Sequence, residues 1–118
     1  MASTTTVVEY GYIFCLSSEP LNMKPYREGE TGVFYVGWTT KDLMTTIEEM
    51  ENNAGSPREF TLEFAKKVKS PARKSETVRD TLDDYDTRIY EMFDFFECKI
   101  SQIKQIFNIF DGTWFVEP

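Results

Sequence analysis

Three runs of apolar residues along the chain have the pattern of β-strands. Residues 7–17 are β-branched and aromatic without a helical period, and they end at turn-forming residues. A polar connection over residues 21–31 leads to a second run at residues 32–38, most simply the antiparallel partner of the first. Residues 59–69 alternate between apolar and polar positions, as in a strand that turns one face toward a core.

Apolar positions at helical spacing predict helices between and after these strands. One helix is expected over residues 42–52, with Thr40 or Asp42 as its N-cap. A proline at the first position favours a second helix over residues 71–84. A third is expected from about residue 97 to residue 109, because one side carries the apolar stripe Ile100, Ile103, Ile106, Phe107 and Phe110.

Two short segments leave their structure open. Residues 90–96 are an aromatic run that suits either a strand or the start of a helix, and residues 114–116 suit either a short strand or an exposed apolar tail. The elements together predict an α+β fold, a small three-stranded, mainly antiparallel sheet flanked by two or three helices. The length predicts one domain over residues 1–118, with a core at about 8–96 and a C-terminal helix and tail at 97–118.

Charge is distributed unevenly along the chain. The net charge of -7 and the pI near 4.6 disfavour general wrapping of a polyanion such as DNA. Residues 58–79 nevertheless form a basic patch, which is either a phosphate-facing surface or simply a solvated strand end and helix face. Its candidate nucleic-acid contacts are Arg58, Lys66, Lys67, Lys69, Arg73 and Lys74.

Several kinds of site are disfavoured by composition. Without histidine, Ser-His and Cys-His nucleophilic sites are excluded, and two separated cysteines make a zinc site improbable. Cys15 and Cys98 lie in apolar stretches, as expected for buried free thiols of a reducing compartment. No signal peptide or membrane span is evident, so we expect a soluble intracellular protein in the cytoplasm, the nucleus or a virion.

An acidic cluster and an aromatic cluster suggest two further candidate sites. The aspartates between residues 80 and 86 are more simply a solvated helix end than a cation site, because the pattern of a calcium loop is missing. Exposed aromatic residues of the first two strands could stack on bases, although aromatics in short strands more often belong to a core. The candidates for such a platform are Tyr10, Tyr12, Tyr35 and Trp38.

The order and spacing of several motifs resemble the GIY-YIG endonuclease superfamily, especially its small branch in phages and large DNA viruses. Tyr12-Ile13-Phe14 and Tyr35-Val36-Gly37 stand where that superfamily has its two strand motifs. The turn over residues 37–42 and the hairpin entry over residues 54–60 are also similar to those of the superfamily, as is the basic third strand before a helix. The resemblance covers roughly residues 11–96.

In active members of that superfamily, two strand tyrosines, a helix arginine and a metal-binding glutamate act on one phosphodiester. Here the position of the first tyrosine is Phe14, and that of the arginine is about Thr46. The glutamate position is Ser75, next to Glu76, and a shift of one residue turns a helical side chain by about 100°. Tyr35 is the member of the catalytic set that is retained.

The leading hypothesis is therefore a catalytically degenerate GIY-YIG-like domain that acts as a binding or structural protein, plausibly viral, with no complete catalytic set and no cofactor. One alternative is a metal-dependent endonuclease with an altered site of Tyr12, Tyr35 and Glu76, in which Glu76 binds Mg²⁺ or Mn²⁺. The other is a non-catalytic DNA-binding protein that uses the basic patch. The C-terminal apolar stripe together with Trp114 and Phe115 exceeds what one small core absorbs, so we expect a homodimer interface as a use for the surplus.

Overall fold

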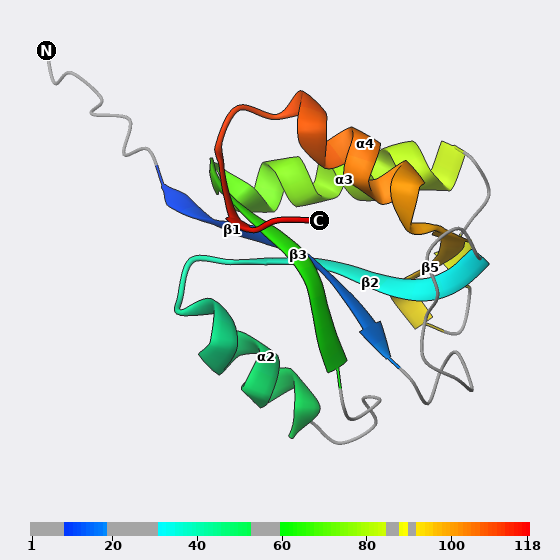
Figure 1. Cartoon of the computed structure of the whole chain (residues 1–118), viewed down its shortest axis with the longest axis horizontal. Helices are drawn as coiled ribbons and strands as arrows, with labels where there is room; N and C mark the ends of the chain where they lie inside the picture. The colour runs from blue at the N-terminus through cyan, green and yellow to red at the C-terminus, as the bar shows by residue number, and fades with distance from the viewer. Residues whose placement is uncertain (1–8, 19–30, 53–59, 85–87, 90–91) are drawn as a thin grey trace, which may run out of the picture.

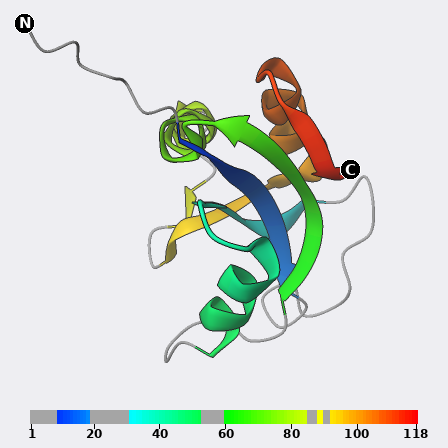
Figure 2. The same cartoon turned by 90° about the vertical axis from the view of Figure 1, so that its left-hand side faces the viewer.

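The computed structural model describes residues 9–18, 31–52, 60–84, 88–89 and 92–118. In this part of the chain, a single curved sheet has α2 on one side and α3 and α4 on the other (Figures 1 and 2). The elements in chain order are β1 (Tyr10–Ser18), β2 (Thr31–Thr39), α2 (Leu43–Glu51), β3 (Phe60–Lys69), α3 (Pro71–Asp84), β4 (Arg88–Ile89), β5 (Met92–Lys99), α4 (Ile100–Ile109) and β6 (Thr113–Val116).

The sheet is larger than the three strands expected from the sequence. Its strand order is β4-β5-β2-β1-β3-β6, and all five pairings are antiparallel, so the α+β class and the antiparallel arrangement are confirmed. The three predicted strands form its centre. The additional strands come from the aromatic run at β5, which pairs with β2, from the four residues of β6, which pair with β3, and from the two residues of β4. The two and four residues of β4 and β6 are too few for a period to identify them, whereas the aromatic run of β5 suited a strand or a helix start equally.

Alternation along the central strands divides the core into two clusters. Ile13, Cys15 and Val36 point toward α3 and α4, where they pack with residues such as Phe107. Phe14 and its neighbours on the same face pack against α2. Because the period of a strand is two, adjacent residues of β1 or β3 lie on opposite sides of the sheet.

The predicted helices are confirmed, with small changes at their ends. Asp42 is the N-cap of α2, and its carboxylate accepts hydrogen bonds from the backbone N–H and the hydroxyl of Thr45 at 3.0 and 2.9 Å. These bonds hold the pKa of the Asp42 carboxyl below its ordinary value. The third helix, α4, begins three residues later than expected, because residues 97–99 belong to β5.

Lys66 is a buried charge that joins three elements. It lies on the α4 side of β3 and is 5% exposed. Its ammonium group donates hydrogen bonds to the carbonyl oxygens of Phe107 and Phe110 at 3.0 and 2.5 Å, and it lies 4.9 Å from the ring centroid of Trp114. A cation near the last carbonyls of a helix is favoured by the helix dipole, and here it adds a donor to the Phe107 carbonyl, which also accepts the backbone N–H of Phe110 at 3.3 Å. Lys66 therefore connects β3 to the end of α4 and to β6.

The apolar stripe of α4 is absorbed by the core of this chain. Ile103, Ile106 and Phe107 are buried, while Phe110 and Trp114 are partly buried against the same cluster. The stripe therefore gives no support to the expected homodimer, although Phe115, which belonged to the same expectation, is 55% exposed. The prediction from the sequence underestimated the size of the core, because β5 and β6 enlarge the sheet on which α4 packs.

Among the helices described, none has both the length and the apolar character needed to cross a membrane.

Replacing Lys66 with alanine is expected to lower the free energy of unfolding by about 2–4 kcal/mol, because two hydrogen bonds to carbonyl groups and the packing of the lysine stem are lost. Lys66→Met keeps the stem and isolates the contribution of the ammonium group. Lys67→Ala is the matched control, with an expected change within about 0.5 kcal/mol because its side chain is exposed. Urea denaturation followed by circular dichroism measures all three. Equal losses for Lys66→Ala and Lys67→Ala would contradict the buried role of Lys66.

Candidate nucleic-acid interface

Two cross-strand pairs of tyrosine and lysine lie at one end of the central strands. In the register of β1 and β3, Tyr10 is opposite Lys69 and Tyr12 is opposite Lys67. All four residues share the face on which α2 packs farther along the strands. Tyr10, Lys67 and Lys69 are exposed, so α2 leaves this end of the face uncovered. Each tyrosine of β1 thus has a lysine of β3 beside it. A ligand that contacts a tyrosine ring therefore lies within reach of an ammonium group.

Phe115 of β6 extends this group of side chains. Its ring is 55% exposed, and its centroid lies 5.0 Å from that of Tyr12, with the two planes tilted by 59°. On the other side, the Lys69 ammonium group lies 6.0 Å from the ring centroid of Tyr10, at the outer limit of a cation–π contact. We name the five residues the lysine–aromatic surface. Its members are Tyr10, Tyr12, Lys67, Lys69 and Phe115.

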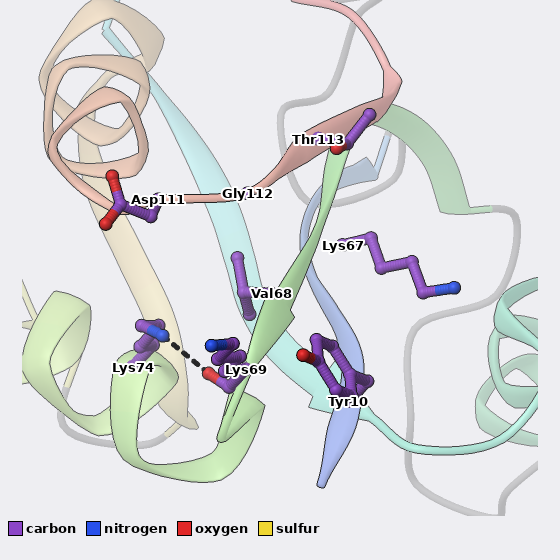
Figure 3. A pocket seen from close by; sticks show the side chains of 8 residues that line it. All are labelled: Tyr10, Lys67, Val68, Lys69, Lys74, Asp111, Gly112 and Thr113. Atoms are coloured by element: carbon purple, nitrogen blue, oxygen red, sulfur yellow. Dashed lines mark hydrogen bonds between the residues drawn. The ribbon is translucent and has the colours of Figure 1, made fainter. Parts of the chain in front are cut away.

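A pocket of about 500 Å³ adjoins this surface at the end of β3 (Figure 3). Besides residues of the lysine–aromatic surface, Lys74 of α3 and Asp111 and Thr113 near β6 line it. The Lys74 ammonium group donates a hydrogen bond to the carbonyl oxygen of Lys69 at 2.7 Å, which fixes it beside the pocket. Figure 3 shows the Lys67 side chain directed away from Lys74 and Asp111, so Lys69 and Lys74 supply the positive charge that favours an anionic ligand beside Asp111.

The predicted basic contacts are thus separated by the sheet. Lys67 and Lys69 lie on the lysine–aromatic surface, and Lys74 lies beside the adjoining pocket. Arg73 is exposed on the first turn of α3, while Arg58 lies outside the described residues. Lys66 is removed from the set, because its ammonium group points into the opposite layer and is held by α4. Burial there lowers the pKa of Lys66, an effect that Asp111 partly offsets.

The two strand positions of the catalytic motif lie within an aromatic cluster. Phe14 is 1% exposed, and its ring centroid is 6.1 Å from that of the half-buried Tyr35. Tyr35 also contacts Phe60 and Phe95, with ring centroids 6.3 and 5.4 Å away. Gly37 gives room for this packing, since a Cβ atom there would lie 2.9 Å from the ring tip of Phe14. The site that the first strand motif would form is therefore apolar.

Thr46 stands at the position that the resemblance gives to the helix arginine. Its side chain is half-buried and contacts the sheet. Its hydroxyl is 2.8 Å from the hydroxyl of Thr39 and 3.0 Å from the carbonyl oxygen of Asp42. The Thr39 hydroxyl in turn accepts a hydrogen bond from the backbone N–H of Lys41 at 3.1 Å. A short neutral network thus occupies the position at which the resemblance to the superfamily would place a cation.

The residues of the altered nuclease site are not brought together. Tyr12 and Tyr35 lie on the α2 side of the sheet, whereas α3, which carries Glu76, packs on the opposite side. Ser75 is fully buried on α3, and its hydroxyl has no hydrogen-bond partner among the residues that the structure describes. Within the described residues, no three carboxylate or thiol side chains are placed to hold one metal ion.

The aromatic platform differs from the one that the sequence indicated. Tyr10 and Tyr12 belong to it, but Tyr35 packs into the core cluster, and Trp38 is opposite Ile13 and so lies on the other face. Sequence reasoning missed Phe115, because residues 114–116 are too short a run for a strand and its register to be identified. The only signal was that Phe115 is aromatic and directly follows Trp114, so that in a strand the two side chains would point to opposite faces.

The T5orf172 domain model matches residues 9–111 of the chain. The matched region runs from the start of β1 to just beyond α4, and β6 with Phe115 follows it. No curated protein and no solved structure matches the chain.

The placement of the lysines predicts different rates of reaction with an amine-acylating reagent at pH 8. Lys67 and Lys69 are expected to react at least about tenfold faster than Lys66, although the lowered pKa of Lys66 favours its reactive neutral form. Burial and two hydrogen bonds to carbonyl groups protect Lys66 until the protein unfolds. Mass spectrometry of peptides gives the rates, with urea-unfolded protein as the control. Equal rates in the folded protein would place Lys66 at the surface.

Proposed function

Because the chain belongs to the T5orf172 domain family, which is associated with an endonuclease-related fold in phage, we propose that it binds nucleic acid without cleaving it. The family indicates a nuclease-like or DNA-binding domain. Within that class, the proposal is a catalytically degenerate, GIY-YIG-like domain that keeps a binding surface.

The observation that carries this proposal is a contrast between two parts of one sheet face. Near α2, the catalytic positions are occupied by Phe14 in the core and by Thr46 in a neutral hydrogen-bonded network. Phosphodiester cleavage needs a base for the attacking water and a cation for the developing charge, and neither residue supplies them. At the other end of the same face, Lys67 and Lys69 are exposed and available to phosphates.

Electrostatics predicts that this binding is weak and sensitive to salt. The chain carries a net charge of -7, so a polyanion approaches against an overall repulsion. Lys67, Lys69 and Lys74 offer about two to three phosphate contacts, which corresponds to a slope of about -2 to -3 in a plot of log affinity against log salt concentration for duplex DNA. Binding is therefore best measured at low ionic strength.

We expect Lys67→Glu with Lys69→Glu to weaken DNA binding about tenfold or more at low salt, because two attractive contacts become repulsive. The matched control is Lys99→Glu with Lys104→Glu, which changes the net charge equally at β5 and α4. Gel retardation with a labelled duplex and a single strand measures the binding of both variants. An equal loss in the two variants would show that only net charge matters and that the lysine–aromatic surface is not the binding site.

Cleavage is tested in the same samples with supercoiled plasmid and Mg²⁺ or Mn²⁺, and no nicking above the blank is expected. Tyr35→Phe is the control variant. Cleavage that this substitution abolishes would overturn the degenerate reading in favour of the altered site of Tyr12, Tyr35 and Glu76. If neither cleavage nor retardation is observed, the proposal of nucleic-acid binding is overturned, and a structural or protein-binding role remains.

A further inference from the structure

We infer that the lysine–aromatic surface binds single-stranded nucleic acid in preference to duplex, through stacking of bases on its rings. The inference rests on the proposed function, because it names the kind of nucleic acid that the proposed surface accepts. It differs from the sequence-based platform in its members and in its position at the β1, β3 and β6 end of the sheet.

The rings of this surface are accessible in a way that core aromatics are not. Tyr10 is 53% exposed and Phe115 is 55% exposed, while Tyr12 supports Phe115 from beneath at a centroid distance of 5.0 Å. Exposed aromatic rings lose little freedom on binding and present flat faces, which the faces of all four bases match. Two rings on β1 and one on β6, with β3 between the two strands, thus form one stacking area.

The lysines stand between the rings. Lys67 is beside Tyr12 and between it and Thr113 of β6, and Lys69 is beside Tyr10. Neighbouring strands are about 4.8 Å apart, and residues two positions apart on one strand are about 7 Å apart, so each ring has an ammonium group within the span of one nucleotide. The spacing allows a base to contact a ring while its phosphate contacts a lysine.

The adjoining pocket continues the positive lining past the end of β3. Lys69 and Lys74 lie on its rim, and Thr113 supplies a hydroxyl from the start of β6 (Figure 3). The carboxylate of Asp111 on the same rim repels phosphates, which disfavours a ligand with many closely spaced phosphates. A flexible single strand directs individual phosphates to the lysines and away from the aspartate, which a rigid duplex does less readily.

Duplex DNA suits this surface poorly for two reasons. Paired bases are stacked on both faces, so the rings reach only the grooves and the backbone. Binding to the backbone alone depends on phosphate contacts, and the surface has few lysines in a molecule of net charge -7. Stacking by single-stranded bases supplies affinity that does not depend on charge.

The test is fluorescence anisotropy with a labelled 20-nucleotide oligothymidine and a 20-base-pair duplex at the same low salt. The intact chain is expected to bind the single strand about tenfold or more tightly than the duplex. Tyr10→Ala and Phe115→Ala are each expected to weaken single-strand binding by about 5- to 100-fold, as for the loss of one stacked base. Tyr10→Phe keeps the ring and is expected to bind as the parent does.

Matched controls separate stacking from general apolar contact and from charge. Met44→Ala and Ile109→Ala remove exposed apolar side chains elsewhere and are expected to change binding less than about twofold. Lys67→Gln is expected to reduce the magnitude of the single-strand salt slope by about 0.7, whereas Tyr10→Ala leaves the slope unchanged. Because Phe115→Ala also removes a contact of β6, thermal unfolding is measured for every variant, and Tyr10→Ala carries the test if Phe115→Ala does not fold.

The outcomes distinguish this inference from the proposed function. Equal or tighter duplex binding that still needs Lys67 and Lys69 would overturn the single-strand preference and leave the proposed function in place. A single-strand preference unaffected by Tyr10→Ala and Phe115→Ala in folded protein would overturn the role of the rings. Binding of neither probe would overturn both, and an acidic protein partner or a second copy would then be the occupant to test.

Discussion

The hydrogen bonds of the Lys66 ammonium group are the interaction on which the arrangement of the C-terminal half depends. A buried cation is costly unless polar groups surround it, and the carbonyl oxygens of Phe107 and Phe110 at the end of α4 both accept hydrogen bonds from it. The Phe107 carbonyl also accepts the backbone N–H of Phe110, so the lysine adds a second bond there. Because Trp114 packs on the same lysine, the start of β6 is fixed against β3, and this pairing places Phe115 on the opposite face.

Because the side chains of β3 alternate between the two faces of the sheet, its neighbouring lysines have different roles. Lys66 turns inward and stabilises the fold, whereas Lys67 and Lys69 turn to the other face and remain in solvent. The same division separates the positions of the catalytic motif, since Phe14 and Tyr35 face α2 while Ser75 and Glu76 belong to α3 behind the sheet. The structure thus supports a binding face more readily than a shared reaction centre.

Much of the fold was predictable because its central strands and helices are long enough to show a period. The three central strands, the cap at Asp42 and the limits of α3 follow from local patterns. The outer strands did not, since β4 and β6 have two and four residues and gain their structure from partners distant in sequence. Lys66 was assigned to the surface for the related reason that a charged residue shows its burial only through carbonyl groups some forty residues away.

The packing around Phe14 and Thr46 also bears on how this chain can evolve. The ring tip at which a tyrosine carries its hydroxyl already lies against Gly37, and an arginine at position 46 would have to break the hydrogen bond between Thr46 and Thr39. Each of these substitutions alone would disturb a contact that the structure shows. Selection for stability therefore opposes both substitutions, whereas the exposed lysines and rings are under no such packing constraint.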